Sequence, residues 1–253
     1  MSDLNLVQTR GGEDLDRWPG RERRTPLRAD RHYLMLQSLA AALRTEIDRS
    51  LGDRHGLRVL DIGCGVKPYY PMLAGRAAEY RGLDAAWGPG VDDIGVVEKL
   101  PYEDRSFDVV LCTQVLEHVV DPAQAVGEIA RVLTGDGVAL VSTHGVFLYH
   151  PDPVDFWRWT HAGLEQLFRT SADWAEIRVL SNGEAVACMA YIACQYLDEL
   201  GGRLGSERVR RGMLRSVNVV AERLDRRLPP RARDGAPGSL SMNYLVSARR
   251  PPG

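Results

Sequence analysis

The sequence contains few lysines and few cysteines, and it has no long apolar run. Lys67 and Lys99 are its two lysines, so arginine supplies nearly all of the positive charge. The four cysteines form no C-x-x-C pair and lie near no histidines at zinc spacing, which favours free buried thiols in a reducing cytosol. No apolar run approaches the roughly 18 residues that cross a bilayer, and the chain starts without a signal segment. We therefore expect a soluble, cytoplasmic protein.

A surplus of positive charge is also missing. The formal net charge is −2 and the isoelectric point is about 6.3. This argues against a nucleic-acid binder, because such proteins usually present a basic face to the phosphates. With 253 residues, of which 44% are hydrophobic and 26% charged, the chain suits one α/β domain with room for additions.

Short apolar runs alternate with amphipathic segments along the chain. The runs that predict strands are 57–62, 79–84, 107–113, 137–144, 175–181 and 239–250. Helical spacing predicts helices over 31–51 and 121–133, with Asp30 and Asp121 as N-caps, and a helix capped by Thr160. Strands that alternate with helices predict an α/β fold with a mostly parallel sheet and helices on both faces.

The two ends of the chain differ from this middle part. Residues 1–28 are polar and aperiodic, which predicts a mobile N-terminal arm before a single domain over 29–253. Two further helices are predicted over 183–228, as an insertion before the last strand. Apolar residues surround most of the first of these helices, which favours burial in a lid or a homodimer contact over one-sided membrane contact.

The stretch VLDIGCGVKPYY predicts a ligand site at the end of the first strand. A strand ends in Asp61, and Gly63 and Gly65 then permit a sharp turn and a close approach of backbone to ligand. Position 68 is proline where the dinucleotide fingerprint needs glycine, so a pyrophosphate fits poorly. A carboxylate before the glycines suits a ligand with an amino group. Asp84 ends the second strand, where a carboxylate can accept hydrogen bonds from both hydroxyls of a ribose.

These motifs, together with VEKLPYEDRSFDVVLCTQVLEHVVDP and GVALVST, resemble the class I S-adenosylmethionine-dependent methyltransferase family in its small-molecule branch. The resemblance covers about residues 55 to 181 and a late strand around 242–249. It implies a Rossmann-like sheet of seven strands whose last strand is an antiparallel insertion. It also implies S-adenosyl-L-methionine as the cofactor, bound across the ends of the first strands.

The resemblance also implies which residues hold the cofactor: the glycine turn at the methionine part, an acid at the ribose, a loop at the adenine and a residue near the sulfonium. These residues are Asp61, Gly63, Cys64, Gly65, Asp84, Ala85, Val97, Glu98 and Gln114. The chain departs from the family at Lys67, where a small residue is common, and at Val96, where an aspartate commonly bonds the adenine amino group. Adenine should therefore be recognised by backbone groups or by packing.

The aromatic stretch YHPDPVDFWRWT follows the strand predicted over 137–144. It should lie at the carboxyl edge of the sheet, beside the transferable methyl group, and its position predicts a substrate wall. We expect Tyr149, Trp157 and Arg158 to contact the substrate, although Arg158 could instead form a structural ion pair. Because Trp157 and Trp159 alternate, one of them should pack in the core.

Methyl transfer to a hydroxyl needs a group that removes a proton. A histidine with its ordinary pKa of roughly 6.5 suits this task near neutral pH, so His144 and His150 are the catalytic candidates. Asp155 would orient a histidine or bind the acceptor. Each histidine could also be structural, and Glu117 and His118 are expected to orient the turn after the strand over 107–113. Nearby histidines and aspartates could hold a metal, but we expect a metal-free reaction.

The predicted function is transfer of a methyl group to a hydroxyl, or an amine, of a small polar metabolite. A sugar or a glycosylated natural product, within secondary metabolite biosynthesis, is the expected acceptor. Two alternatives stay open: a non-catalytic cofactor-binding partner protein and a nucleic-acid methyltransferase. The second is disfavoured by the acidic isoelectric point and by CTQVLEH, which stands where DNA amine methyltransferases carry a D/N-P-P-Y/F motif.

Overall fold

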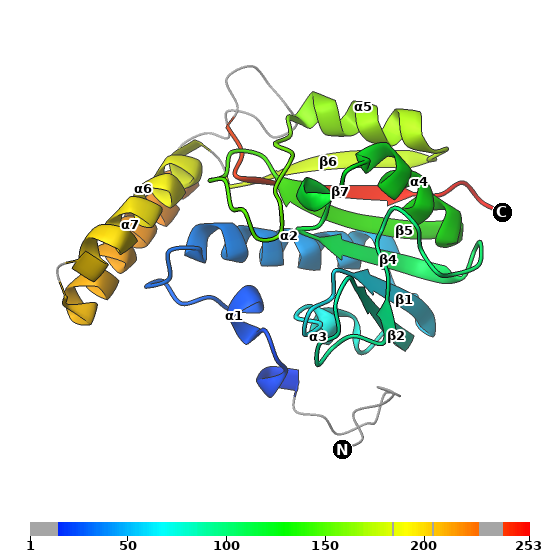
Figure 1. The fold of residues 1–253 in the computed structure, drawn as a ribbon, viewed down its shortest axis with the longest axis horizontal. Coiled ribbons are helices and arrows are strands. Elements are labelled where there is room, and N and C mark those ends of the chain that lie inside the picture. The colour runs from blue at the N-terminus through cyan, green and yellow to red at the C-terminus, as the bar shows by residue number, and fades with distance from the viewer. Residues whose placement is uncertain (1–14, 184, 204, 228–239) are drawn as a thin grey trace.

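The computed structural model describes residues 15–183, 185–203, 205–227 and 240–253. Within them, one sheet has the strand order β3-β2-β1-β4-β5-β7-β6 (Figure 1). The strands are β1 Leu57–Ile62, β2 Ala77–Asp84, β3 Asp93–Ile94, β4 Phe107–Thr113, β5 Leu133–His144, β6 Glu176–Asn182 and β7 Asn243–Arg249. Strands β1 to β5 pair in parallel, and β7 runs antiparallel between β5 and β6. The predicted Rossmann-like sheet of seven strands is confirmed. Strand β3 was missed because two residues carry no periodic pattern.

The helices are α1 Arg21–Arg24, α2 Tyr33–Leu51, α3 Tyr70–Leu73, α4 Pro122–Val132, α5 His161–Ser171, α6 Ala185–Arg203 and α7 Glu207–Arg227, with 3-10 turns η1 Leu15–Arg17 and η2 Leu116–His118. The five long helices were predicted from the sequence, whereas the short helices α1 and α3 were not. Asp121 and Thr160 cap α4 and α5, each accepting from the backbone N–H three residues on. Asp30 was wrongly predicted as the cap of α2. Its carboxylate accepts from the N–H of His32 in the preceding turn, and α2 begins after it.

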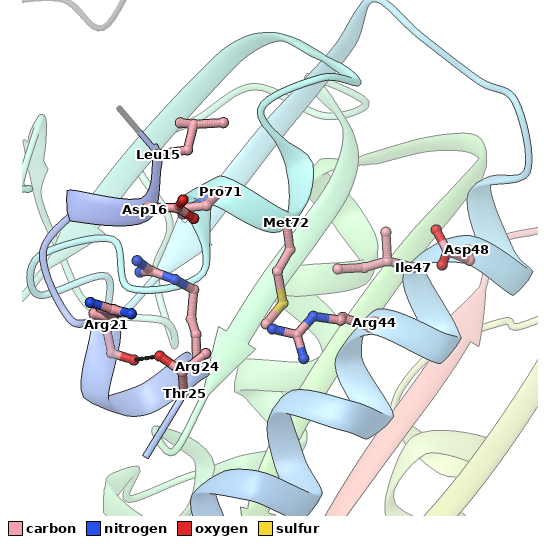
Figure 2. Close-up of a pocket in the computed structure, with 10 residues that line it drawn as sticks. All are labelled: Leu15, Asp16, Arg21, Arg24, Thr25, Arg44, Ile47, Asp48, Pro71 and Met72. Carbon is pink, nitrogen blue, oxygen red and sulfur yellow. Dashed lines mark hydrogen bonds between the residues drawn. The ribbon is translucent and has the colours of Figure 1, made fainter. Parts of the chain in front are cut away.

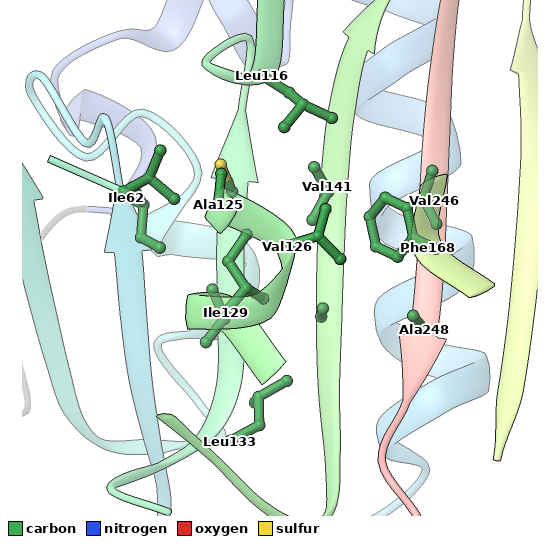
Figure 3. Close-up of a cluster of buried hydrophobic side chains, with 14 of the residues drawn as sticks. Ile62, Leu116, Ala125, Val126, Ile129, Leu133, Val141, Phe168, Val246 and Ala248 are labelled. Atoms are coloured by element: carbon green, nitrogen blue, oxygen red, sulfur yellow. The ribbon is translucent and has the colours of Figure 1, made fainter. Parts of the chain in front are cut away.

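Helices α4 and α5 cover one face of the sheet (Figures 1 and 3). Ile129 of α4 and Phe168 of α5 pack on Val141 and Val246, and all four side chains are fully buried. Each of these large apolar side chains contributes about 1.5–3 kcal/mol of hydrophobic stabilisation through its burial.

Helices α2 and α3 cover the opposite face. Leu43 and Ile47 of α2 pack against Val109 of β4 and Leu140 of β5. Successive strand residues point to opposite faces, so Val109 faces α2 while its neighbour Val110 faces α4 and α5. The near-continuous apolar runs in the sequence follow from this two-sided burial.

Helices α6 and α7 lie side by side at one end of the sheet and extend away from it (Figure 1). Their inner side packs on the first turn of α2, where Tyr33 and Leu36 contact Cys188 and Tyr191. The predicted insertion before the last strand is thus present. Its role as a lid or a dimer contact stays a prediction. In the described part of the chain, no helix combines the length and apolarity needed to cross a membrane.

Residues 15–28 pack on the domain, which differs from the mobile arm predicted there. Arg24 is only 6% exposed and donates to the carbonyls of Trp18 and Pro68. The indole Nε1 of Trp18 donates to the carbonyl of Lys67 at 2.9 Å. Composition could not reveal this packing, because its partners are backbone carbonyls far along the chain. The rest of the predicted arm lies outside the described residues.

Replacement of Phe168 by alanine tests the packing of α5. The Phe168→Ala variant should lose about 3–5 kcal/mol of unfolding free energy in urea titrations, because a buried ring is replaced by a cavity. Phe156→Ala is the matched control, since the Phe156 ring is 52% exposed, and should lose less than about 1 kcal/mol. Equal losses in the two variants would contradict the assigned core.

Candidate active site

The site begins at the edge of the sheet where four parallel strands end. Strands β2, β1, β4 and β5 are adjacent and run in the same direction, so their carboxyl ends lie next to one another. Gly63 follows β1, Asp84 ends β2, Gln114 follows β4 and His144 ends β5. The fold therefore gathers the predicted cofactor and catalytic segments at the edge where sheets of this type bind ligands.

The turn after β1 depends on its two glycines. Gly63 and Gly65 have φ angles of +65° and +50°, which glycine adopts without strain. A Cβ on Gly63 would lie 2.3 Å from the side chain of Val115, whereas a Cβ on Gly65 would meet no atom within 4 Å. Gly63 is thus required by packing, and Gly65 leaves open space where a ligand can approach the backbone.

Asp84 holds the glycine turn with both oxygens of its carboxylate. Oδ2 accepts from the backbone N–H of Gly65 at 3.0 Å, and Oδ1 accepts from that of Ala85 at 2.7 Å. The side chain is partly exposed, and each oxygen keeps a lone pair for a ribose hydroxyl. Its role as the ribose acid is compatible with this geometry and stays a prediction.

Asp61 and Cys64 lie behind the turn. Asp61 is 1% exposed and accepts from the hydroxyl of Tyr80 at 2.8 Å. Burial raises the pKa of Asp61 to about 7 and that of the Cys64 thiol to about 12. The amino group of a bound methionine moiety would lower the pKa of Asp61 again, because an opposite charge favours the carboxylate. Cys64 contributes a buried, protonated thiol to the packing, and contact of Asp61 and Cys64 with the cofactor stays a prediction.

Lys67, which departs from the family pattern, has a structural partner. Its Nζ lies 2.5 Å from Oδ2 of Asp92, and its side chain is 3% exposed. Asp92 also accepts from the N–H of Gly82 at 2.7 Å. The ion pair therefore ties the glycine turn to the loop after β2.

The predicted adenine loop directs two of its side chains into the scaffold. Val97 is 3% exposed and belongs to the core. Oε1 of Glu98 accepts from the N–H of Val120 at 3.1 Å, just before α4. Val96 is 51% exposed. Adenine contacts by Val97 and Glu98 stay a prediction, and their side-chain positions leave backbone groups and packing for that role.

Gln114 presents an unsatisfied acceptor beyond the end of β4. Its backbone adopts a left-handed φ of +57°, and its side-chain Nε2 donates to Oγ of Ser142 at 3.0 Å. Oε1 is buried and has no hydrogen-bond partner among the described residues. An unpaired buried acceptor is costly, so a ligand donor at this point would stabilise the site.

Glu117 is the main site residue that sequence reasoning missed, since it was expected only to orient a turn. It is 0% exposed, and its Oε2 accepts from Oγ1 of Thr143 at 2.9 Å. Its Oε1 lies 3.1 Å from Nε2 of His144, although the two atoms are not aligned as a hydrogen bond. A buried carboxylate beside a histidine is a signal for proton chemistry. The sequence does not reveal this contact, because His144 lies 27 positions after Glu117.

Burial also sets the protonation of this pair. It raises the pKa of Glu117 to about 7. The pKa of His144 is lowered to about 3, chiefly by burial and in smaller part by the nearby charges of Arg158 and His150. The ring of His144 stacks on Phe147 with 3.7 Å between centroids. Near neutral pH, the imidazole is neutral and the titrating proton belongs to the carboxyl.

Arg158 forms the structural ion pair that the sequence left open as an alternative, and it holds the aromatic loop; its contact with substrate stays a prediction. Its guanidinium donates to both oxygens of Asp155 and to the carbonyls of Phe147, Leu148 and Trp157. These five bonds use all five guanidinium donors. Asp155 is likewise occupied, because Arg158 holds its carboxylate. A further contact of Arg158 with substrate would have to replace one of these bonds.

His150 lies beside His144 in a small cluster of rings. The centroids of these two rings are 5.6 Å apart, and that of His118 is 5.0 Å from His150. The backbone N–H of His150 donates to Asp155 at 3.3 Å, and its Nδ1 lies 3.9 Å from the same oxygen. Both predicted histidines and Asp155 are thus in one place. In the described part of the chain, no three His, Cys, Asp or Glu side chains are grouped to hold a metal ion.

The aromatic residues of the loop divide as predicted between surface and packing. Tyr149 is 68% exposed and Trp157 is 38% exposed. Trp159 packs against the core and stacks on Trp157 with 5.6 Å between centroids. Nε1 of Trp157 donates to the carbonyl of Val119 at 2.8 Å. Substrate contact by Tyr149 and Trp157 stays a prediction.

Comparison with known proteins identifies the family of the chain. Residues 28–176, which are more than half of the chain, match the family model described as a methyltransferase domain. A ubiquinone biosynthesis O-methyltransferase of Alkalilimnicola ehrlichii is 32% identical over 112 residues, 38% of this chain and 45% of that protein. The uncharacterized methyltransferase YcgJ of Bacillus subtilis is 36% identical over 113 residues, 38% of this chain and 43% of that protein. The chain thus spans less than half the length of these curated relatives.

Among solved structures, that of the [4+2]-cyclase SpnF is similar with a TM-score of 0.53 at 18% identity, covering 85% of this chain and 82% of that one. At this identity the likeness concerns the fold alone. The family match and the site together make the class plain: the chain belongs to the class I S-adenosylmethionine-dependent methyltransferase family. The cofactor of this family is S-adenosylmethionine.

Replacement of Asp84 tests the predicted ribose contact. Asp84→Asn should weaken binding of S-adenosylhomocysteine roughly 10- to 100-fold in calorimetry, because hydrogen bonds to a charged carboxylate contribute about 1.5–3 kcal/mol. Asp53→Asn, at an exposed position, should leave the affinity unchanged. Unaltered binding by the Asp84 variant would remove this residue from the cofactor site.

Proposed function

We propose that the protein transfers the methyl group of S-adenosylmethionine to a hydroxyl of a small polar metabolite, with an amine as the alternative acceptor. A sugar or a glycosylated natural product is the proposed acceptor class. The observation that favours a hydroxyl acceptor is the buried Glu117–His144 pair at the sheet edge beside Gln114, because this pair can take up the proton that a hydroxyl loses. The curated relatives named as O-methyltransferases support the same chemistry.

The cofactor would be held by the segments at the ends of β1, β2 and β4. The open space beside Gly65, the fixed carboxylate of Asp84 and the unpaired Oε1 of Gln114 fit a ligand with a ribose and an amino group. When bound, S-adenosylmethionine supplies an activated methyl group on a positive sulfur. The protein then aligns the acceptor oxygen with that methyl group and removes the proton of the oxygen.

His144 and Glu117 would manage that proton together. Nδ1 of His144 is buried and has no hydrogen-bond partner in the described residues, while Nε2 faces Glu117. An acceptor hydroxyl that donates to Nδ1 would pass its proton to the imidazole as its oxygen bonds to the methyl carbon, and the methyl–sulfur bond would break to leave the neutral thioether S-adenosylhomocysteine. An ionised Glu117 raises the basicity of His144 and stabilises the imidazolium, because opposite charges attract strongly where water is excluded. His150 would be the second candidate base, held through Asp155 and Arg158.

The pH profile of kcat/KM tests this assignment. Glu117 assists only when ionised, and burial raises its pKa to about 7, so activity should rise as pH increases through about 7. Glu117→Gln should flatten this rise, and His144→Ala should lower kcat about 10²- to 10⁴-fold. His150→Ala measures the second base, and His55→Ala is the control at an exposed histidine. Unchanged kcat in both the His144 and His150 variants would contradict a hydroxyl acceptor and indicate a neutral amine.

The proposal also includes a cellular location and an oligomeric state. The four cysteines are free and buried, which supports a cytoplasmic location. On α6, Met189, Tyr196 and Leu200 are 57%, 62% and 48% exposed, and their spacing of seven and four places them on one helical face. This apolar face supports a homodimer through α6 and α7, without nucleic acid as a partner.

Replacement on this face tests the homodimer. Tyr196→Glu should shift the mass measured by light scattering from dimer to monomer, because a charge would be buried in the contact. Glu199→Gln, a neighbouring exposed change, should leave the dimer intact. A monomeric wild-type protein would contradict the proposed contact.

A further inference from the structure

A second cluster of charged side chains lies away from the candidate active site. It surrounds a cavity of about 400 Å³ between the N-terminal segment, α2 and α3 (Figure 2). Arg21 and Arg24 of α1 line one side, and Arg44 of α2 lines the other. Small-molecule sites measure about 300–1,000 Å³, so the cavity can hold a metabolite.

The charges around the cavity are unbalanced. Of its two acids, Asp48 is already paired with Arg76 at 2.9 Å. Arg21 and Arg44 form no ion pair with a described residue. The three arginines carry three positive charges, and the other acid, Asp16, carries one negative charge. The lining therefore has an excess of two positive charges. A phosphate monoester carries about −1.5 to −2 at neutral pH, which matches this excess.

Arg24 adds to the positive potential because it is buried without an acid. It is 6% exposed, its donors serve backbone carbonyls, and no described carboxylate lies within ion-pair distance of it. Burial lowers its pKa; Glu22 opposes this, whereas the charges of Arg21 and Arg44 lower it further. A buried cation without a counter-ion is costly, so an anion in the cavity would be stabilised.

The remaining wall of the cavity is apolar. Ile47 is 2% exposed, and Pro71 and Met72 are half-buried. Figure 2 shows the side chain of Met72 reaching from α3 toward Arg44. An anion with an organic body would therefore place its charge at the guanidinium groups and its body against this wall.

We propose that this cavity is a second ligand site, which binds a small organic phosphate. The phosphate lies between Arg21 and Arg44, whose planar guanidinium groups suit phosphate oxygens. The organic body packs on Met72 and Pro71. The ligand does not take part in methyl transfer, because the cavity lies on the α2 side of the sheet and not at the edge that holds His144.

The cavity also contacts the glycine turn. Arg24 donates to the carbonyl of Pro68, and Trp18 donates to that of Lys67, in the segment that leaves Gly65. Occupancy of the cavity therefore restrains the turn, and ligand and cofactor should change each other's affinity by the same factor. This coupling rests on the proposed cofactor site, whereas binding of the phosphate does not.

Calorimetry with phenyl phosphate, an organic phosphate with an apolar ring, tests the site. The wild-type protein should bind phenyl phosphate at least 10-fold more tightly than phenol and than inorganic phosphate. The double variant Arg21→Gln/Arg44→Gln should lose at least 10-fold in affinity, and Arg208→Gln, at an exposed arginine outside the cavity, should lose nothing. Benzoate should bind more weakly than phenyl phosphate, because it carries one negative charge.

A comparison of Met72→Glu with Met72→Gln isolates charge from shape. The glutamate should abolish binding of phenyl phosphate and the glutamine should retain most of it. Equal binding by phenol, or full affinity in the double arginine variant, would overturn the site. Inorganic phosphate that bound as tightly as phenyl phosphate would contradict the apolar wall. The affinity for S-adenosylhomocysteine, measured with and without phenyl phosphate, then tests the coupling. An unchanged affinity would contradict the coupling but not the phosphate site.

Discussion

The candidate active site depends on one buried side chain, Glu117. Its carboxylate accepts from Thr143 and faces His144, so it joins the turn after β4 to the end of β5. Its backbone carbonyl accepts from the N–H groups of Phe156 and Trp157, so the same residue also anchors the aromatic loop. The turn after β4, the end of β5 and the aromatic loop are therefore held to one another through this residue. Burial of the carboxylate raises its pKa to about 7, because the charged form loses its contact with water.

The aromatic loop owes its shape to a second ionic contact. Arg158 uses all of its guanidinium donors in hydrogen bonds to Asp155 and to three carbonyls of the loop. This arrangement explains why a segment with two prolines and little regular structure can present His150 at a defined place beside His144. The charge of Arg158, predicted to contact substrate, thus holds the aromatic loop together.

Much of the fold and part of the site followed from local pattern. Strands β1 and β4 and the caps of α4 and α5 were predicted correctly, because alternation, periodicity and capping chemistry act over a few residues. Gly63 and Asp84 were placed at the cofactor edge for the same reason. What local pattern could not predict depends on the tertiary structure. Arg24 donates to backbone carbonyls, which carry no sequence signal, and the contact between Glu117 and His144 joins residues that are remote in sequence. Arg158 pairs with Asp155, the structural alternative that the sequence left open, and its other bonds go to backbone carbonyls.

The sequence by itself predicted the class of protein through the resemblance of its motifs to a known family. It also placed the two glycines and the two acids at strand ends, because strand and turn patterns act over a few residues. The tertiary structure alone decided which groups can take part in chemistry. Burial moves the pKa of Glu117 to about 7 and that of His144 to about 3, so the proton belongs to the acid that was expected to be structural. The physical reason is desolvation, which depends on everything packed around a group and not on its neighbours in the chain.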